Sequence, residues 1–179
     1  MSATVARLPS RPKLDPETGI VRGHASLFGV LDLSKDRVMP GAFAASLLRR
    51  GAAGVRMLWQ HDPKEPIGRW TTIREDGRGL YVEGALALST RRGRDVHELI
   101  RAGAVDGLSI GFHARRSTRE AGGIRRLTEL DLWEISVVTF PMQPAARLLE
   151  SRARTAATRL AERLATAAAR LSTPPLPAV

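Results

Sequence analysis

Hydrophobic positions along the chain follow two periods, and together they predict a domain built mainly of strands. Alternating or continuous apolar runs that are bounded by turn residues indicate strands. These segments are residues 20–30, 55–61, the two halves of 66–88 around the turn sequence EDGRG, and 107–138 divided at EAGG. Apolar positions at helical spacing predict helices over 40–51, 89–103 and 147–171, and the first two end at a glycine.

This order of elements favours an α+β fold over a doubly wound parallel sheet, because strands and helices do not alternate regularly. We expect a curved, mostly antiparallel β-barrel flanked by short helices, with a C-terminal helical tail. The domain is expected to span residues 19–149. A flexible leader over 1–18 would precede it, and a basic helical tail over 150–179, ending in a Pro-rich disordered segment, would follow it.

Composition narrows the classes of function. The 179 residues carry a net charge of +10, which invites a nucleic-acid partner. The arginines are spread along the chain, however, and aromatic residues make up only 4%, so nucleic acid is not expected as the primary partner. The absence of cysteine excludes disulfides, a thiol nucleophile and thiolate metal sites. No apolar run is long enough to cross a membrane, so we expect a soluble, intracellular protein without a metal or cofactor.

A serine stands between two glycines in the stretch GLSIGFHARR, which begins at Gly107. Strand alternation places Ser109 on one face together with Gly111 and His113, away from the apolar side chains of the stretch. The Gly-x-Ser-x-Gly spacing resembles a hydrolase nucleophile elbow, but an elbow requires a turn and a helix after the serine, and here the strand continues. Ser109 is therefore either an ordinary strand residue or a nucleophile that a distant histidine must activate.

Four histidines compete for that activating role. His113 lies too far along the same strand, and His97 lies in a predicted helix whose spacing does not match a zinc-binding helix. His24 lies in the first predicted strand, where a structural role is equally open. His61 ends a strand next to the turn-forming sequence DPKEP, a position from which an imidazole can face a cleft, and it is the leading candidate.

An acidic residue is the third candidate. Glu134 stands between large apolar neighbours in the sequence LWEIS, so its carboxylate is expected to be partly buried. A buried carboxylate needs a partner, because desolvation penalises its charge. Two alternatives remain open: Glu134 pairs with an arginine, or it orients a histidine and offsets the imidazolium that forms during catalysis.

Six motifs in order resemble one family of viral enzymes. They are GHASLFGVLD, PGAF, LWQHDPKEPIGRW, GLYVEGAL, GLSIGF and LWEISVVTFPMQPAA, and they cover residues 19–149. The set resembles the prohead (capsid maturation) serine proteases of tailed bacteriophages and of phage-derived gene transfer agents. That family is similar in fold to the herpesvirus capsid-maturation protease.

The resemblance implies the site residues. By position, the family's histidine falls on His61 and its serine on Ser109. The third member is a second histidine in the herpesvirus relatives, whereas the corresponding strand here carries Glu134, with Asp62 as the rival. We place the oxyanion hole at the backbone N–H groups of Met142 and Gln143, where the chain leaves the strand of Glu134.

The resemblance also implies the partners. It indicates a serine endopeptidase that removes the scaffold segment of the major capsid protein, and trims itself, inside the immature capsid in the cytoplasm of a bacterial host. Self-association is left open. The tail would be either a scaffold-binding segment that is later cleaved or a solvated helix. The alternatives in function are an inactive capsid-assembly protein with the same fold and an Arg-rich nucleic-acid-binding module.

Overall fold

The computed structural model describes residues 18–149. Residues 1–17 of the leader predicted for 1–18, and the whole tail predicted for 150–179, lie outside the described residues. In chain order the elements are β1 (Ile20–Leu27), β2 (Asp36–Val38), α1 (Ala44–Arg50), η1 (Ala52–Gly54), β3 (Arg56–Trp59), β4 (Asp62–Glu75), β5 (Gly79–Leu86), α2 (Arg91–Arg101), β6 (Gly107–Arg119), η2 (Ala121–Gly123) and β7 (Arg125–Val138).

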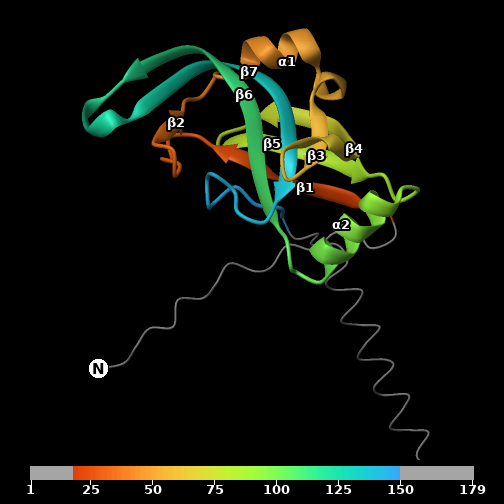
Figure 1. Cartoon of the computed structure of the whole chain (residues 1–179). Coiled ribbons are helices and arrows are strands. Elements are labelled where there is room, and N and C mark those ends of the chain that lie inside the picture. Colours follow the sequence, from red (N-terminus) through yellow and green to blue (C-terminus); the bar gives the residue numbers. More distant parts are fainter. Residues whose placement is uncertain (1–17, 150–179) are drawn as a thin grey trace, which may run out of the picture.

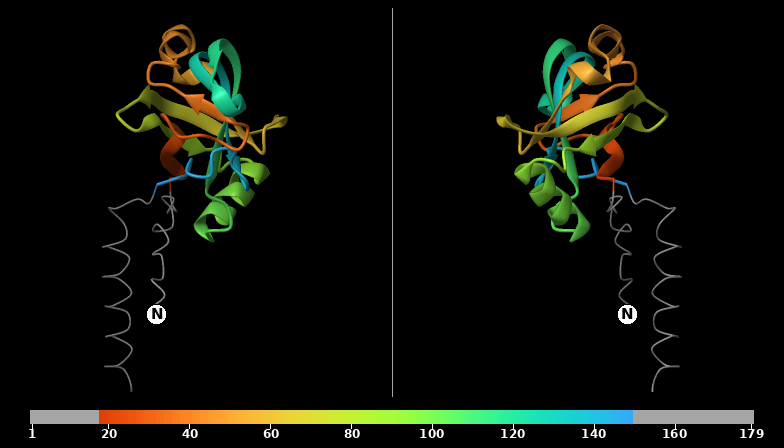
Figure 2. Two further views of the ribbon diagram at one scale, coloured as in Figure 1. Left: turned by 90° about the vertical axis from the view of Figure 1, so that its left-hand side faces the viewer. Right: turned by 90° about the vertical axis from the view of Figure 1, so that its right-hand side faces the viewer.

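The strands form one mixed sheet in the order β1-β5-β4-β3-β7-β2, and β6 pairs with the other edge of β7. Most pairs are antiparallel, as expected, but β2 and β3 run parallel to opposite ends of β7. The sheet curls into a half-barrel, with α1 and α2 at opposite ends of it (Figures 1 and 2). Long strands twist, and bulges such as the one opposite Gly111 and Phe112 increase the bend. The expected fold class is confirmed.

The inner face of the curled sheet holds the hydrophobic core. Its largest fully buried side chains come from α2, from most of the strands and from Phe43, which precedes α1: Phe43, Met57, Ile67, Leu80, Ile100, Leu108, Leu127, Leu130, Leu132, Ile135, Val82 and Val96. Burial of each such side chain contributes about 1.5–3 kcal/mol. Because β6 and β7 both contribute to this core, the strand pair that carries Ser109 and Glu134 is fixed against the rest of the domain.

The second predicted helix is confirmed, whereas the start of the third is wrong. Thr90 caps α2 by accepting the N–H of Gly93 at 3.0 Å. Residues 147–149, predicted to begin a helix, instead form extended bridges, in which Arg147 pairs with Gly107 and Leu148 pairs with Gly23. Leu148 is buried in the core, so tertiary packing overrides local helix propensity here. Neither described helix is long and apolar enough to cross a membrane.

The turn between β4 and β5 depends on one aspartate. The Oδ1 atom of Asp76 accepts the N–H groups of Arg78 at 2.8 Å and Gly79 at 3.1 Å, and Oδ2 lies 2.9 Å from Nε2 of the buried His24. Burial alone would raise the pKa of Asp76. The hydrogen bonds from Arg78, His24 and Gly79 outweigh that effect, and they lower the pKa to about 2.

Replacement of this aspartate should change the pH dependence of stability. A lowered pKa stabilises the fold fully above the unfolded value of about 3.9, and this contribution is lost as the pH falls through about 2. Because solvent screens part of this effect at a partly exposed carboxylate, Asp76→Asn should lower the free energy of unfolding at pH 7 by about 1 kcal/mol and flatten its fall between pH 4 and 2. Urea unfolding at several pH values measures this effect. Asp95→Asn, in an exposed ion pair of α2, is the control; an equal loss in both variants would contradict the assignment.

Candidate active site

His61 was predicted to end a strand, but β3 ends at Trp59 and His61 lies in the tight turn between β3 and β4. Both turn residues have positive φ, 54° at Gln60 and 62° at His61, which is the conformation of a two-residue hairpin turn. Residues other than glycine adopt it at a cost, so surrounding contacts must hold it. The N–H of His61 donates to the Oγ of Ser136 at 3.1 Å, the N–H of Gln60 donates to the carbonyl of Val137 at 3.0 Å, and the Gln60 amide donates to Thr139 at 2.7 Å. The turn is thereby fixed to the end of β7.

The carboxylate of Glu134 contacts the imidazole of His61. Its Oε1 lies 2.6 Å from His61 Nδ1, and its Oε2 accepts the hydroxyl of Ser136 at 2.6 Å. The Glu134 side chain is 13% exposed, which agrees with the expected partial burial, and no arginine among residues 18–149 pairs with it. Of the two partners left open for Glu134, the structure therefore contains the histidine. The rival Asp62 is exposed and accepts the N–H of Lys64 at 2.8 Å.

A glycine provides the space for this carboxylate. Gly111 lies opposite Glu134 across the β6–β7 pair. A Cβ at Gly111 would overlap Oε1 of Glu134, and the Cδ and Cγ atoms would lie at 2.8 and 2.9 Å. The second glycine of Gly-x-Ser-x-Gly is thus explained by a close approach of the Glu134 side chain.

Ser109 lies on β6 directly opposite Ser136 and is 5% exposed. It lines a cavity of about 260 Å³ together with His61, Ile110 and Phe112. No hydrogen bond joins the Ser109 hydroxyl to His61 within the described part of the chain. Hydrogen bonds of this kind are often long or poorly aligned before substrate binds. The structure therefore brings the serine and the histidine to one cavity, and the histidine to the glutamate.

The other histidines have different surroundings. Nε2 of His24 contacts Asp76, and His97 is buried in α2 with its Nδ1 3.4 Å from Glu98. His113 is exposed and packs edge-on against Trp133 with ring centroids 5.5 Å apart. Of the four histidines, His61 is the one that lines the cavity with Ser109.

Met142 and Gln143 also line this cavity. The side chain of Gln143 is anchored to the end of β1: Oε1 accepts the N–H of Leu27 at 2.6 Å, and Nε2 donates to the carbonyls of Leu27 and Val30 at 3.1 Å. The carbonyl of Met142 accepts the N–H of Leu33. The backbone N–H groups of Met142 and Gln143 donate to no other residue in 18–149.

Charged residues that sequence reasoning missed line another part of the cavity. Asp36 forms an ion pair with Arg125 at 2.5 Å, and Asp32 accepts the N–H groups of Ser34 and Asp36 at 2.8 and 2.7 Å. Burial raises the pKa of Asp32. The sequence indicated these cavity residues only through the alternating Asp, Ser and Asp of the loop LDLSKDRVM. The described residues contain no cluster of three or more acidic, His or Cys side chains that could hold a metal ion.

Solved structures share this fold. The KSHV protease, solved in complex with a hexapeptide phosphonate inhibitor, is similar with a TM-score of 0.51 at 11% identity, over 72% of this chain and 63% of that one. The capsid assembly protease of bacteriophage T4 is similar with a TM-score of 0.52 at 16% identity, over 68% of this chain and 82% of that one. The fold is therefore that of the herpesvirus and phage capsid proteases.

Sequence relatives identify the family. The prohead protease of Enterobacteria phage HK97 is 34% identical over 135 residues, which cover 74% of this chain and 60% of that protein. A capsid polyprotein of Pseudomonas phage PAJU2 is 31% identical over 143 residues, which cover 75% of this chain and 20% of that protein. The chain thus spans less than two thirds of either relative. The model of the Caudovirus prohead serine protease family matches residues 8–160, and the chain belongs to this family.

Proposed function

We propose that the chain is a serine endopeptidase that cleaves the scaffold segment of the major capsid protein, and its own chain, inside the immature capsid in the host cytoplasm. One observation carries the proposal: an imidazole held by a carboxylate at 2.6 Å lines the same cavity as a serine. Family membership and the name of the HK97 relative support the choice of a capsid substrate.

In the proposed mechanism, Ser109 is the nucleophile and His61 is the general base. Because the Glu134 carboxylate can only accept, its contact assigns the proton to Nδ1 and leaves the lone pair on Nε2. Nε2 takes the Ser109 proton as Oγ attacks the peptide carbonyl, and then returns it to the leaving amine. Water, deprotonated by the same nitrogen, releases the acyl group from Ser109. The Glu134 charge stabilises the imidazolium in both steps.

The outer edge of β6 supports an extended peptide as the substrate. The Leu108 N–H donates away from β7, to the carbonyl of Ala146 at 3.0 Å. Backbone groups alternate between the two edges of a strand, so those of Ile110 and Phe112 face the same outer side, beside the cavity. A peptide that pairs there would bring its carbonyl next to Ser109.

The oxyanion hole is proposed at the backbone N–H groups of Met142 and Gln143. Both residues line the cavity, and the anchored Gln143 side chain holds their loop in place. Such donors stabilise the tetrahedral oxyanion by about 3–4 kcal/mol. This geometry requires the two N–H groups to point toward the oxygen that develops on the carbon attached to Ser109.

Co-expression with the major capsid protein encoded by the same genome tests the function. Mass spectrometry should find the capsid protein shortened at one defined site, and only in the presence of this chain. A full-length capsid protein beside a folded, soluble partner would contradict the proposal and would favour an inactive assembly protein with the same fold.

The role of Glu134 predicts the effect of filling the space at Gly111. Gly111→Ala should displace the carboxylate from His61 and lower kcat on a peptide substrate by about 10²-fold, since misplacement by about 1 Å has this effect. The melting temperature should change little, because a side chain and not the backbone gives way. Gly77→Ala, where nothing lies within 4 Å of the added Cβ, is the control. Unchanged kcat in Gly111→Ala would contradict the orienting role.

A further inference from the structure

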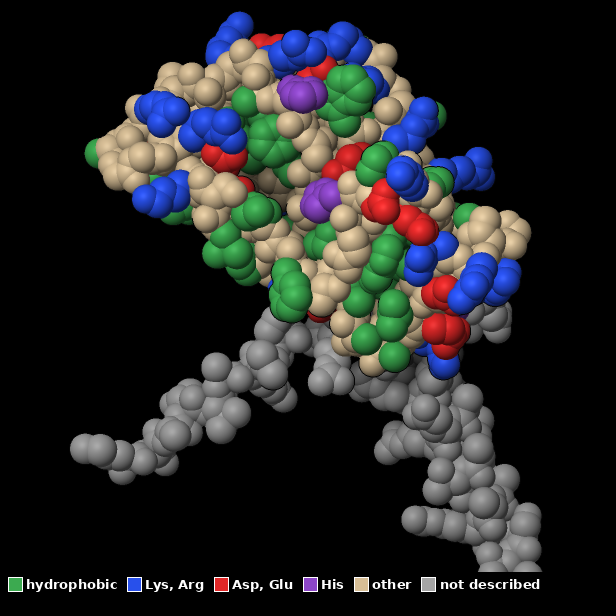
Figure 3. Space-filling view, in the orientation of Figure 1, with side chains coloured by type: hydrophobic (Ala, Val, Ile, Leu, Met, Phe, Trp, Pro, Cys, Tyr) green, Lys and Arg blue, Asp and Glu red, His purple; other side chains and the backbone are tan. Residues whose placement is uncertain are grey.

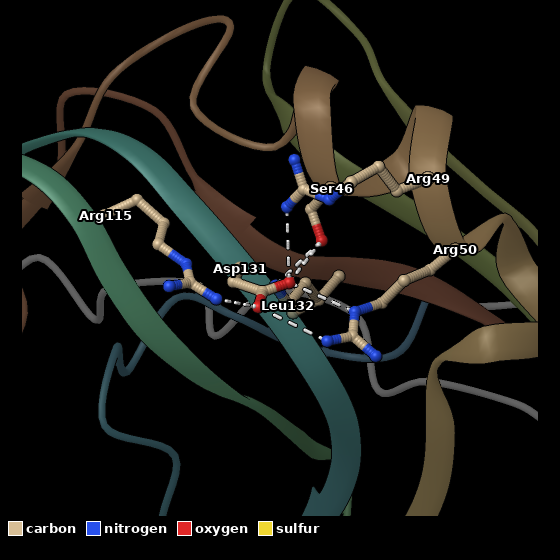
Figure 4. Close-up of polar contacts among 6 residues, drawn as sticks. All are labelled: Ser46, Arg49, Arg50, Arg115, Asp131 and Leu132. Carbon is tan, nitrogen blue, oxygen red and sulfur yellow. Dashed lines mark hydrogen bonds and ion pairs between the residues drawn. The ribbon is translucent and has the colours of Figure 1, made fainter.

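Three arginines from two elements form ion pairs with one buried aspartate. Asp131 on β7 has a side chain that is 4% exposed, and Arg50 of α1 donates to both of its oxygens at 3.1 and 3.3 Å. Arg115 of β6 donates to it at 2.7 Å, and Arg49 lies at 3.5 Å (Figure 4). The hydroxyl of Ser46 completes the cluster at 3.4 Å. Arg50 and then Arg115 hold the pKa of Asp131 well below its usual range, so the carboxylate stays charged.

This cluster keeps more positive charge than the aspartate can neutralise. Three guanidinium groups against one carboxylate leave a net charge of +2. The side chains of Arg49 and Arg115 are 52% and 56% exposed, and each uses one nitrogen on Asp131, so the remaining N–H donors of each are directed elsewhere. The arrangement therefore presents fixed guanidinium groups to a ligand, and fixed groups lose little entropy when they bind.

An exposed aromatic residue extends the cluster. The ring of Trp133 is 4.4 Å from the guanidinium of Arg50, packs against His113, and is 48% exposed. We call the five residues Arg49, Arg50, His113, Arg115 and Trp133 the Arg–Trp patch. Figure 3 shows Lys and Arg side chains gathered over α1 and the β6–β7 hairpin, on the face toward the viewer.

We propose that the Arg–Trp patch binds an acidic segment of the polypeptide substrate outside the cleavage site. The patch lies on the strands that carry the candidate active site, since Trp133 is next to Glu134 and His113 is four residues from Ser109. At about 3.3 Å per residue, the patch begins about 13 Å from the serine, within reach of an extended substrate. This inference rests on the proposed endopeptidase function.

Charge excludes other occupants. A second copy of this chain carries a net charge of +10, and the segments 1–17 and 150–179 each carry a net positive charge, so neither complements the patch. Nucleic acid would supply negative charge, but the patch offers one exposed indole where single-strand binding uses several stacked rings. A peptide with Asp or Glu side chains suits the forked guanidinium donors and the indole edge.

Two peptide substrates that share one cleavage site test the proposal. The site is that found by mass spectrometry in the co-expression experiment, and the flanks are either Glu-rich or neutral Gln/Ser-rich. The wild-type protein should cleave the Glu-rich peptide with a kcat/KM about tenfold higher, and salt should reduce the difference. In Arg49→Gln/Arg115→Gln this advantage should disappear, while cleavage of the neutral peptide stays unchanged. Arg91→Gln/Arg101→Gln, which removes the same charge from α2, is the matched control.

The outcomes separate the patch from the protease. Equal kcat/KM for both peptides, or equal losses in both double variants, would contradict the binding of an acidic segment by the Arg–Trp patch. Neither result would contradict the proposed endopeptidase function. If neither peptide is cleaved, the proposed function is contradicted. Fluorescence anisotropy of a labelled Glu-rich peptide then measures its binding to the Arg–Trp patch directly. The wild type should then bind it about tenfold more tightly than Arg49→Gln/Arg115→Gln. No such difference, or tighter binding of a single-stranded oligonucleotide than of the peptide, would overturn the patch.

Discussion

Ser109→Ala is expected to reduce the rate of peptide cleavage by at least about 10⁴-fold, because it removes the atom that forms the acyl-enzyme. The melting temperature should stay close to that of the wild type, since the Ser109 hydroxyl makes no hydrogen bond to another described residue. Initial rates on a peptide that spans the capsid cleavage site measure the effect, and circular dichroism monitors the fold.

Ser117→Ala provides the matched control for this variant. Ser117 lies on the exposed part of the same strand, β6, and outside the cavity, so its removal should leave the rate unchanged. Cleavage by Ser109→Ala at more than about a tenth of the wild-type rate would show that another group attacks the substrate.

Glu134→Gln is expected to lower kcat by about 10³–10⁴-fold with little change in KM. The amide is close to the carboxylate in shape but carries no charge, so it cannot offset the imidazolium. It can also present an N–H₂ group to His61 and select the wrong tautomer. Steady-state kinetics on the same peptide separate a fall in kcat from weaker substrate binding.

Asp62→Asn tests the rival acid in the same assay. Asp62 follows His61 in the chain, but its carboxylate accepts the N–H of Lys64 at the start of β4. Its replacement should therefore change kcat by less than about threefold, on the scale of ordinary surface substitutions. A larger effect in Asp62→Asn than in Glu134→Gln would reverse the assignment of the orienting acid.

Local sequence signals predicted most of the elements. The turn sequence EDGRG marked the β4–β5 hairpin because Asp76 binds the N–H groups of its own turn, and Gly103 followed α2 with a φ of 72°. Residues 147–149 were mispredicted because Leu148 packs into a core that only the tertiary structure defines. Parallel pairing of β2 and β3 with β7 was likewise outside the reach of local patterns.

Parts of the candidate site could not be predicted from the sequence, because they depend on contacts between residues far apart in the chain. His61 and Glu134 are 73 positions apart, and alternation on either strand could not choose between an arginine and a histidine as the partner of Glu134. The positive φ of His61 had no sequence signal, because neither Gln60 nor His61 is a residue that such turns favour. The Arg–Trp patch could not be predicted from local patterns, because Arg49 and Arg50 lie in the last turn of α1, where basic residues are common.

Covalent labelling with a fluorophosphonate, which reacts with activated serines, tests the central claim most directly. Peptide mapping by mass spectrometry should find the phosphonyl adduct on Ser109 of the wild-type protein, and labelling should fall by at least about 10²-fold in His61→Gln because the base is lost. An adduct on a different serine, or equal labelling of Ser109 with and without His61, would contradict the proposed path of the proton from the serine to the histidine.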